Sequence, residues 1–183
     1  PFLRPPRLDR SDASMAIDAA TRESLELTQS SAGTRRGSLL DAVDRTVTGA
    51  GARLLAADIA APLMDRAAIE ARLDVVQYFH DTPGLRDGAR ATLRALPDIG
   101  RAIGRLAAGR GGPRDLGQLR DGLDGAWRLG ERLGQIADAP ALLRTLAPQL
   151  RGHGELVDLL KRALVPEPPV DASAGGFIAE GYD

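Results

Sequence analysis

The apolar positions between residues 38 and 62 recur with helical spacing and predict two consecutive helices. Ser38 stands where an N-cap would, and Asp41 follows three residues later in the position of a capping box. Thr48 provides a second N-cap signal, and Pro62 marks the end of the helix that it opens. We therefore expect two helix starts with little loop between them.

Each predicted helix carries a set of apolar residues that we expect to form its buried side. The first has Leu39, Leu40, Val43 and Val47, and the second has Leu54, Leu55 and Ile59. Asp65 is the expected cap of a third helix, whose stripe is Ile69, Leu73, Val76 and Phe79. Thr82 followed by Pro83 predicts another helix start, because proline is well tolerated at the first helical position. A short helix around residues 99–106 then ends at Gly109.

The longest predicted helix runs from Pro113 to Ala137. Its apolar stripe has a three-four spacing and consists of Leu116, Leu119, Leu123, Ala126, Leu133 and Ala137. The helix also contains Gly117, Gly122, Gly125, Gly130 and Gly134. Since each glycine costs about 1 kcal/mol relative to alanine, such a helix must draw its stability from tertiary packing. Gly130 lies in the stripe, where a neighbouring helix could approach closely; for the other four, close packing and mere exposure remain alternatives.

The remaining segments complete a mainly α fold class with a few short β-strands. Two more helices are expected near residues 141–150 and 155–164. The strands are expected near residues 14–28, where apolar residues alternate weakly, and near residues 175–180, where Phe177 and Ile178 follow two glycines. Residues 21–27 fit either a short helix or an extended piece.

Composition supports a helical core and disfavours several functions. Leu and Ala dominate the apolar residues, with only 3 Phe, 2 Tyr and 1 Trp, whereas strands favour β-branched and aromatic residues. The 24 Lys and Arg are balanced by 25 Asp and Glu, so a broad DNA-binding surface is not expected. The chain has no cysteine and no apolar run long enough to span a membrane, which makes the cytoplasm the expected location.

Residues that carry chemistry are few. The glycine-containing turns at residues 33–38 and 48–53 have no lysine, and Lys161, the sole lysine, follows no glycine loop, so no nucleotide site is expected. His80 and His153 lack the accompanying ligands of a metal site. We predict no catalytic, cofactor-binding or metal-binding residue and no enzymatic activity for this chain. Arg35 and Arg36 could contact DNA phosphate, although salt bridges to nearby acids are the favoured alternative.

Six sequence blocks resemble the core (lever) domain of the MutS family of DNA mismatch-repair proteins. The blocks are PFLRPPR at 1–7, IDAATRESLELT at 17–28, GTRRGSLLDAVDRTVTGAGARLL at 33–55, PLMDRAAIEARLDVV at 62–76, RGGPRDLGQLRDGL at 110–123 and GGFIAEGYD at 175–183. The second to fourth are the most specific, because their order and spacing match the family pattern almost without gaps. The chain departs from that pattern at Ser24, where Asn is common, and at residues 56–58, where a basic residue and Trp are usual.

The resemblance implies a structural role within a larger dimeric protein. Residues 1–13 would be a linker from an upstream connector domain, residues 14–165 the helical core domain, and residues 166–183 an extended segment leading toward the lever and a clamp domain. The matched motif residues implied to be structural are Gly37, Ser38, Leu39, Leu40, Arg45, Thr46, Gly51, Arg53, Leu54, Leu55, Pro62 and Leu63. Because the chain begins with Pro1 rather than Met, we expect it to be part of a longer polypeptide.

The same resemblance implies the partners and cofactors. The parent protein would bind mismatched double-stranded DNA and a second MutS-type subunit, act in the cytoplasm at the nucleoid, and use ATP and Mg in a separate ATPase domain. No membrane and no small-molecule substrate are expected for this segment. Two alternatives stay open from the residues alone: a helical protein-interaction scaffold, and a small nucleic-acid-binding module that uses Arg35, Arg36 and Arg110.

Overall fold

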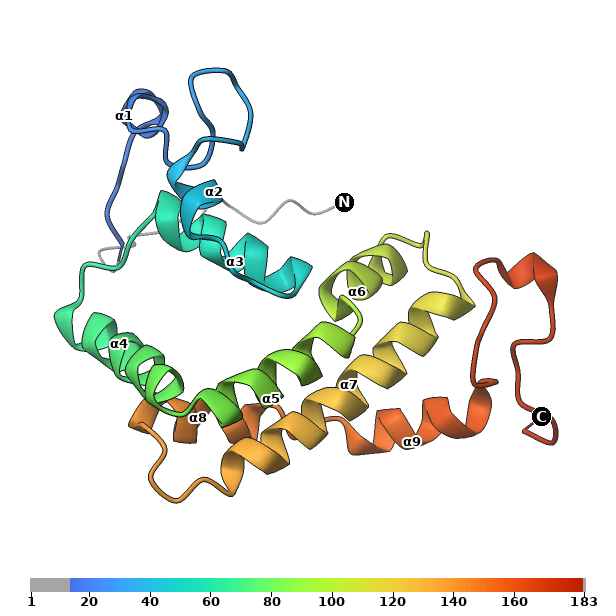
Figure 1. The fold of residues 1–183 in the computed structure, drawn as a ribbon. Helices are drawn as coiled ribbons and strands as arrows, with labels where there is room; N and C mark the ends of the chain where they lie inside the picture. Colours follow the sequence, from blue (N-terminus) through green and yellow to red (C-terminus); the bar gives the residue numbers. More distant parts are fainter. Residues whose placement is uncertain (1–13, 183) are drawn as a thin grey trace, which may run out of the picture. The chain divides into compact units, whose positions relative to one another are not determined.

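The computed structural model describes residues 14–182, which form nine α-helices and one 3-10 helix (Figure 1). The helices are α1 (Ala19–Ser24), α2 (Leu39–Val43), α3 (Gly49–Ala60), α4 (Arg66–Asp81), α5 (Pro83–Ala95), α6 (Ile99–Ala107), α7 (Pro113–Gly134), α8 (Ala141–Gln149), α9 (Gly154–Ala163) and η1 (Ala172–Ala174). The described residues divide into two compact units, one containing residues 14–45 and 52–70 and the other residues 46–51 and 71–182. The predicted linker at residues 1–13 lies outside the described residues.

The mainly α class is confirmed, but the predicted strands are wrong. Between residues 14 and 182 the extended segments make only two isolated antiparallel bridges, Ser14 with Leu63 and Leu164 with Ile178. A β-ladder consists of consecutive bridged residue pairs, and each of these segments has a single bridged pair. Residues 19–24 form α1, which agrees with the short-helix alternative for residues 21–27, and the Asp18 carboxylate caps this helix by accepting a hydrogen bond from the backbone N–H of Thr21 at 2.8 Å.

The predicted helix starts at Ser38, Thr48 and Asp65 correspond to real caps. Their side-chain oxygens accept backbone N–H groups three residues ahead, at 3.2, 2.9 and 2.9 Å respectively. The capping box at Ser38 differs in one detail, since the Asp41 carboxylate accepts the N–H of Gly37 at 3.1 Å. Pro83 begins α5 as predicted.

Several predicted apolar stripes are only partly buried. In α2 only Leu40 is buried, and in α3 Leu54 is 61% exposed. In α4, Leu73 and Val76 are 58% and 64% exposed. The residues of α4 that do pack against the core of the second unit are Val75, Tyr78 and Phe79. The packed side of α4 is therefore rotated from the stripe that the sequence spacing indicated.

Helix α7 is the central element of the second unit. Helices α6, α8 and α9 pack along it, and α5 touches it more briefly (Figure 1). The hydrophobic core consists of Ala89, Leu129, Leu133, Ala139, Leu143 and Ala147. The helix ends at Gly134, so Ala137 of the predicted stripe lies beyond it and is exposed.

Glycines give α7 its closest contacts. Gly117, Gly122, Gly125 and Gly130 are all buried. A Cβ at Gly122 would lie 2.4 Å from Ile99, and one at Gly130 would lie 2.8 Å from the carbonyl oxygen of Ala147. Such distances are shorter than real Cβ contacts, so the glycines allow neighbouring elements to approach the helix backbone. The close approach predicted for Gly130 is observed, and the same reason applies to Gly122 and Gly125; a Cβ at Gly117 would meet Pro168 at 3.1 Å, which is tight but not excluded.

Candidate functional site

The turn containing Arg35 and Arg36 was the predicted point of phosphate contact. Two glycines at its ends, Gly33 and Gly37, adopt positive φ values of 70° and 87° and allow the chain to reverse. The Arg35 guanidinium forms an ion pair with Asp44, which leaves Arg36 as the exposed cation of the turn without an ion-pair partner in the described part of the chain. The contact with DNA phosphate stays a prediction.

Some of the family-motif residues are brought together by local backbone contacts. Ser38 is 1% exposed, and its hydroxyl donates to the carbonyl of Arg35 at 2.7 Å. The backbone N–H groups of Leu39 and Leu40 donate to the carbonyls of Glu26 and Leu27, both at 2.9 Å. This corner of the first unit is therefore fixed mainly by backbone hydrogen bonds.

Other motif residues lie in short turns. A Cβ at Gly51 would lie 2.9 Å from the Thr48 hydroxyl and 3.6 Å from the Thr46 Cβ, so this glycine leaves room for the cap of α3. The Arg45 guanidinium donates to the carbonyl of Asp44 at 2.9 Å. Pro62 accepts the N–H of Met15 at 2.7 Å, next to the bridge that Leu63 makes with Ser14. Arg53 and Leu54 of α3 are exposed, and Leu55 is half-buried.

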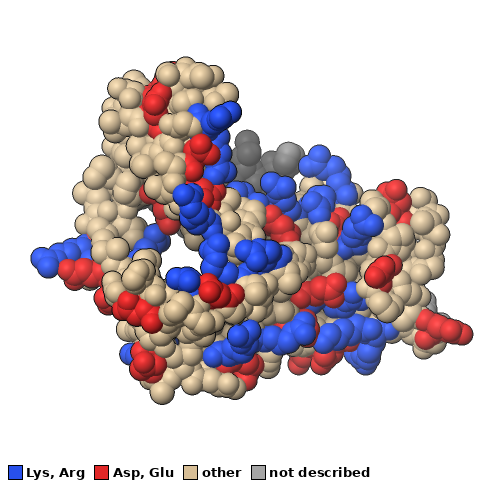
Figure 2. Space-filling view, viewed as in Figure 1, with Lys and Arg blue, Asp and Glu red and all other residues tan. Residues whose placement is uncertain are grey.

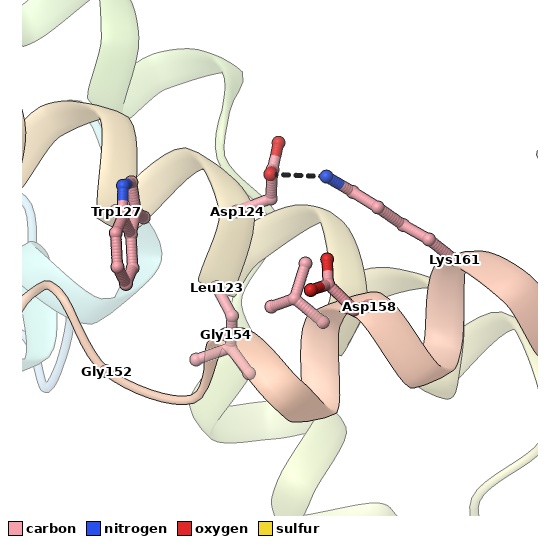
Figure 3. Close-up of a pocket in the computed structure, with 8 residues that line it drawn as sticks. Leu123, Asp124, Trp127, Gly152, Gly154, Asp158 and Lys161 are labelled. Carbon is pink, nitrogen blue, oxygen red and sulfur yellow. Dashed lines mark hydrogen bonds and ion pairs between the residues drawn. The ribbon is translucent and has the colours of Figure 1, made fainter.

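A cavity of about 220 Å³ lies between α7 and α9 (Figure 3). It is lined by Leu123, Asp124, Trp127, Gly152, Gly154, Val157, Asp158 and Lys161. Figure 3 shows the Trp127 indole on one side of the cavity and the ion pair of Asp124 with Lys161 on the other. The Lys161 ammonium donates to the Asp124 carboxylate at 2.7 Å, and Arg128 reaches the other oxygen at 2.6 Å.

The electrostatics of this cavity favour a structural tie between helices over chemistry. The hydrogen bond from Lys161 holds the pKa of Asp124 below its usual value, and the charge of Arg128 adds to the effect. A carboxylate held ionised by two cations is a poor general acid. The lining contains no Ser, Cys or His that could serve as a nucleophile or base.

Neither a metal site nor a membrane-spanning helix occurs between residues 14 and 182. Within residues 14–182, no three His, Cys, Asp or Glu side chains gather in a way that could hold a metal ion. His80 lies 3.0 Å from the Asp81 carboxylate, and His153 caps α9 in a left-handed conformation. None of the helices in this range has both the length and the apolar character that crossing a membrane requires.

Sequence reasoning missed Arg120, a buried arginine on α7. Its side chain is 9% exposed, and its guanidinium donates to the carbonyls of Val165 and Pro166 at 3.0 and 2.6 Å. These bonds fasten the segment after α9 to the central helix. An arginine within a glycine-rich stretch of helix was the available signal, but sequence spacing does not show which carbonyls come near it.

Lys and Arg are interleaved with Asp and Glu on the face that Figure 2 shows. The described helices pack closely, and ion pairs such as Asp124 with Lys161 join them. These features are those of a structural domain.

Comparison with known proteins gives the family. The model of MutS domain III matches residues 20–180, and the chain belongs to this family. DNA mismatch repair protein MutS of Erythrobacter litoralis is 56% identical over 183 residues, and that of Zymomonas mobilis is likewise 56% identical. The MutS protein of Cereibacter sphaeroides is 50% identical over the same length. All of this chain is covered in each case, but it spans only 21% of each of these relatives.

Proposed function

We propose that this chain is the structural core (lever) part of a DNA mismatch repair protein, where it couples the ATPase state to DNA clamping and mismatch recognition. The proposed arrangement places the linker at residues 1–13, the core domain at residues 14–165, and a segment leading toward the lever and clamp at residues 166–183. The full-length protein would bind mismatched double-stranded DNA, pair with a second MutS-type subunit and work in the cytoplasm. Its ATP and Mg would be held by a separate ATPase domain.

The observation that carries the proposal is the packing of α7. Its 22 residues are contacted by four other helices, most extensively by α6, α8 and α9, and buried glycines let neighbouring elements approach its backbone. An element packed this closely moves as a rigid body, because its contacts have little room to deform gradually. A displacement applied at one end of α7 would therefore reach the other end.

Anchors at both ends of α7 support the same role. Near its start, the backbone N–H of Arg114 donates to the carbonyl of Pro169 at 2.9 Å. Toward its end, Glu131 forms an ion pair at 2.8 Å with Arg151, which lies two residues after the end of α8. Both anchored segments follow α7 in the sequence, and they would move with the helix.

The test uses a matched pair of glycine substitutions in the full-length protein. Gly130→Ala places a methyl group 2.8 Å from a backbone oxygen, whereas Gly134→Ala meets nothing closer than 3.9 Å. ATP-induced release from a fluorescent mismatched duplex is measured by rapid mixing. We expect Gly130→Ala to change the release rate by about two- to thirtyfold, the range of coupling changes of about 0.5–2 kcal/mol, and Gly134→Ala to leave it unchanged.

A melting curve and an ATP-binding titration accompany each variant. If Gly130→Ala lowers the melting temperature but releases DNA at the wild-type rate, the packing of α7 does not carry the coupling and the proposal fails. If Gly130→Ala does not fold, Gly122→Ala replaces it, because its methyl group meets the movable side chain of Ile99 instead of backbone.

A further inference from the structure

A second cavity lies where α6 turns into α7, away from the Trp127 cavity. It has a volume of about 350 Å³ and is lined by Arg105, Arg110, Gly111, Gly112, Arg114, Asp115, Val170, Asp171 and Ala172. Three arginines and two aspartates thus surround one small space. The proposed coupling role uses none of their side chains.

The frame of this cavity is rigid. Asp115 is 7% exposed; its carboxylate accepts the Arg105 guanidinium at 2.8 Å and the N–H of Gly112 at 3.0 Å. On the opposite wall, a Cβ at Gly112 would lie 2.1 Å from the carbonyl oxygen of Val170, so the chain at residue 170 rests directly on this glycine. The walls are therefore positioned before any ligand arrives.

The charged side chains of this cavity fall into two groups, one that forms an ion pair and one without an ion-pair partner in the described part of the chain. Arg105 and Asp115 neutralise each other. The guanidinium groups of Arg110 and Arg114 are exposed and have neither an ion pair nor a side-chain hydrogen bond within residues 14–182, and the carboxylate of Asp171 is likewise unpaired there. The set left over carries two positive charges and one negative charge.

We propose that this arginine cavity binds the carboxylate of an acidic side chain on a partner protein. Arg110 and Arg114 both line the cavity, and each guanidinium offers the planar, paired N–H donors that match a carboxylate. The surplus of one positive charge fits a group with a single negative charge. A DNA backbone is the weaker candidate, because its successive phosphates need several cations along a surface and would meet Asp171. The inference does not depend on the coupling role of α7.

The experiment measures binding of a short fluorescent oligoglutamate peptide to the intact protein by fluorescence anisotropy. Arg110→Gln combined with Arg114→Gln is expected to weaken binding about tenfold, since two charge-assisted contacts are lost. Asp171→Asn is expected to strengthen binding about two- to threefold, because it removes the one repelling charge. Arg94→Gln, which changes an exposed arginine of α5 outside this cavity, is the matched control and is expected to have no effect.

The opposite signs of these effects separate ligand binding from mere structural damage. If the double variant binds the peptide as the wild type does, or if the wild type does not bind it, the proposal is overturned.

Duplex DNA without a mismatch and inorganic phosphate serve as competitors. Loss of DNA affinity in the double variant, with no peptide binding by the wild type, would assign the cavity to phosphate and also overturn the proposal. If the double variant does not fold, Asp171→Asn alone still tests whether removal of this negative charge strengthens peptide binding.

Discussion

At the residue scale, Asp115 shows how one carboxylate joins two segments at the start of α7. It accepts hydrogen bonds from Arg105, at the end of α6, and from the backbone of Gly112. We predict that Asp115→Asn lowers the free energy of unfolding by about 1–3 kcal/mol, because a partly buried charge-assisted pair is broken. Chemical denaturation measures the change. Asp87→Asn, at an exposed pair with Arg86, should change it by less than about 0.5 kcal/mol.

The same carboxylate predicts a pH dependence. The hydrogen bond from Arg105 lowers the pKa of Asp115 below its ordinary value of 3.8, and the Gly112 N–H adds to this. A lowered folded-state pKa means that the stabilisation is complete above 3.8 and is lost as the pH falls through the folded-state value. Denaturation of wild type and Asp115→Asn at decreasing pH should show their difference shrinking below 3.8. A difference that is constant with pH would contradict the ion pair.

Arg120 gives a second prediction at this scale. Its guanidinium donates to two carbonyls at once, those of Val165 and Pro166, which a lysine ammonium cannot match with the same geometry. We expect Arg120→Lys to lower the free energy of unfolding by about 1–3 kcal/mol. Limited proteolysis should also cut the variant more rapidly after residue 164. Wild-type cleavage kinetics would show that this segment does not depend on Arg120.

At the element scale, the glycines of α7 illustrate how packing can outweigh helix propensity. Alanine favours an isolated helix by about 1 kcal/mol over glycine. At Gly130, however, the added methyl group would meet the backbone oxygen of Ala147 at 2.8 Å, which only a shift of α8 could relieve. Stability at this position is therefore decided by the neighbouring helix.

We predict opposite effects for two alanine substitutions in this helix. Gly130→Ala should lower the free energy of unfolding by about 1–3 kcal/mol, the usual cost of overpacking. Gly134→Ala should leave it unchanged or raise it by up to about 1 kcal/mol, because its nearest contact would be 3.9 Å away. Thermal and denaturant unfolding of both variants measure the effect. Equal changes would show that close packing does not decide the stability of α7.

At the scale of the whole molecule, the near balance of 24 basic and 25 acidic residues opposes DNA binding by this chain alone. Their mixture over the face in Figure 2 gives no single basic field. We predict that the polypeptide of residues 1–183 binds duplex DNA weakly at physiological salt. A titration at several salt concentrations tests this. Tight binding with a steep salt dependence would favour the nucleic-acid-binding alternative and bring Arg36 and Arg110 back into consideration.

Most of the helix boundaries could be predicted from the sequence, because caps and prolines act within one turn of the chain. Ser38, Thr48 and Asp65 each bond an N–H three residues away, so their effect is local. The two predicted strands were wrong because a strand needs a partner: among residues 14–182, Ile178 and Ser14 each have one bridging residue. Alternating residues alone could not show that the rest of the ladder is missing.

The buried faces and the arginine cavity depended on distant parts of the chain. Leu73 fitted a helical stripe but is 58% exposed, because the core of the second unit meets the neighbouring side of α4. The cavity brings Arg110 and Asp171 together across some 60 residues of sequence. Sequence spacing does not show that two such distant residues line the same cavity.

The sequence by itself determined the helical class, the order of the helices and the family, since each depends on residue types at short, fixed separations. Only the tertiary structure decided which side of α7 is buried, why its glycines are needed and which arginines remain unpaired. The physical reason is that burial and ion pairing depend on distances between elements, and these are set when the helices pack.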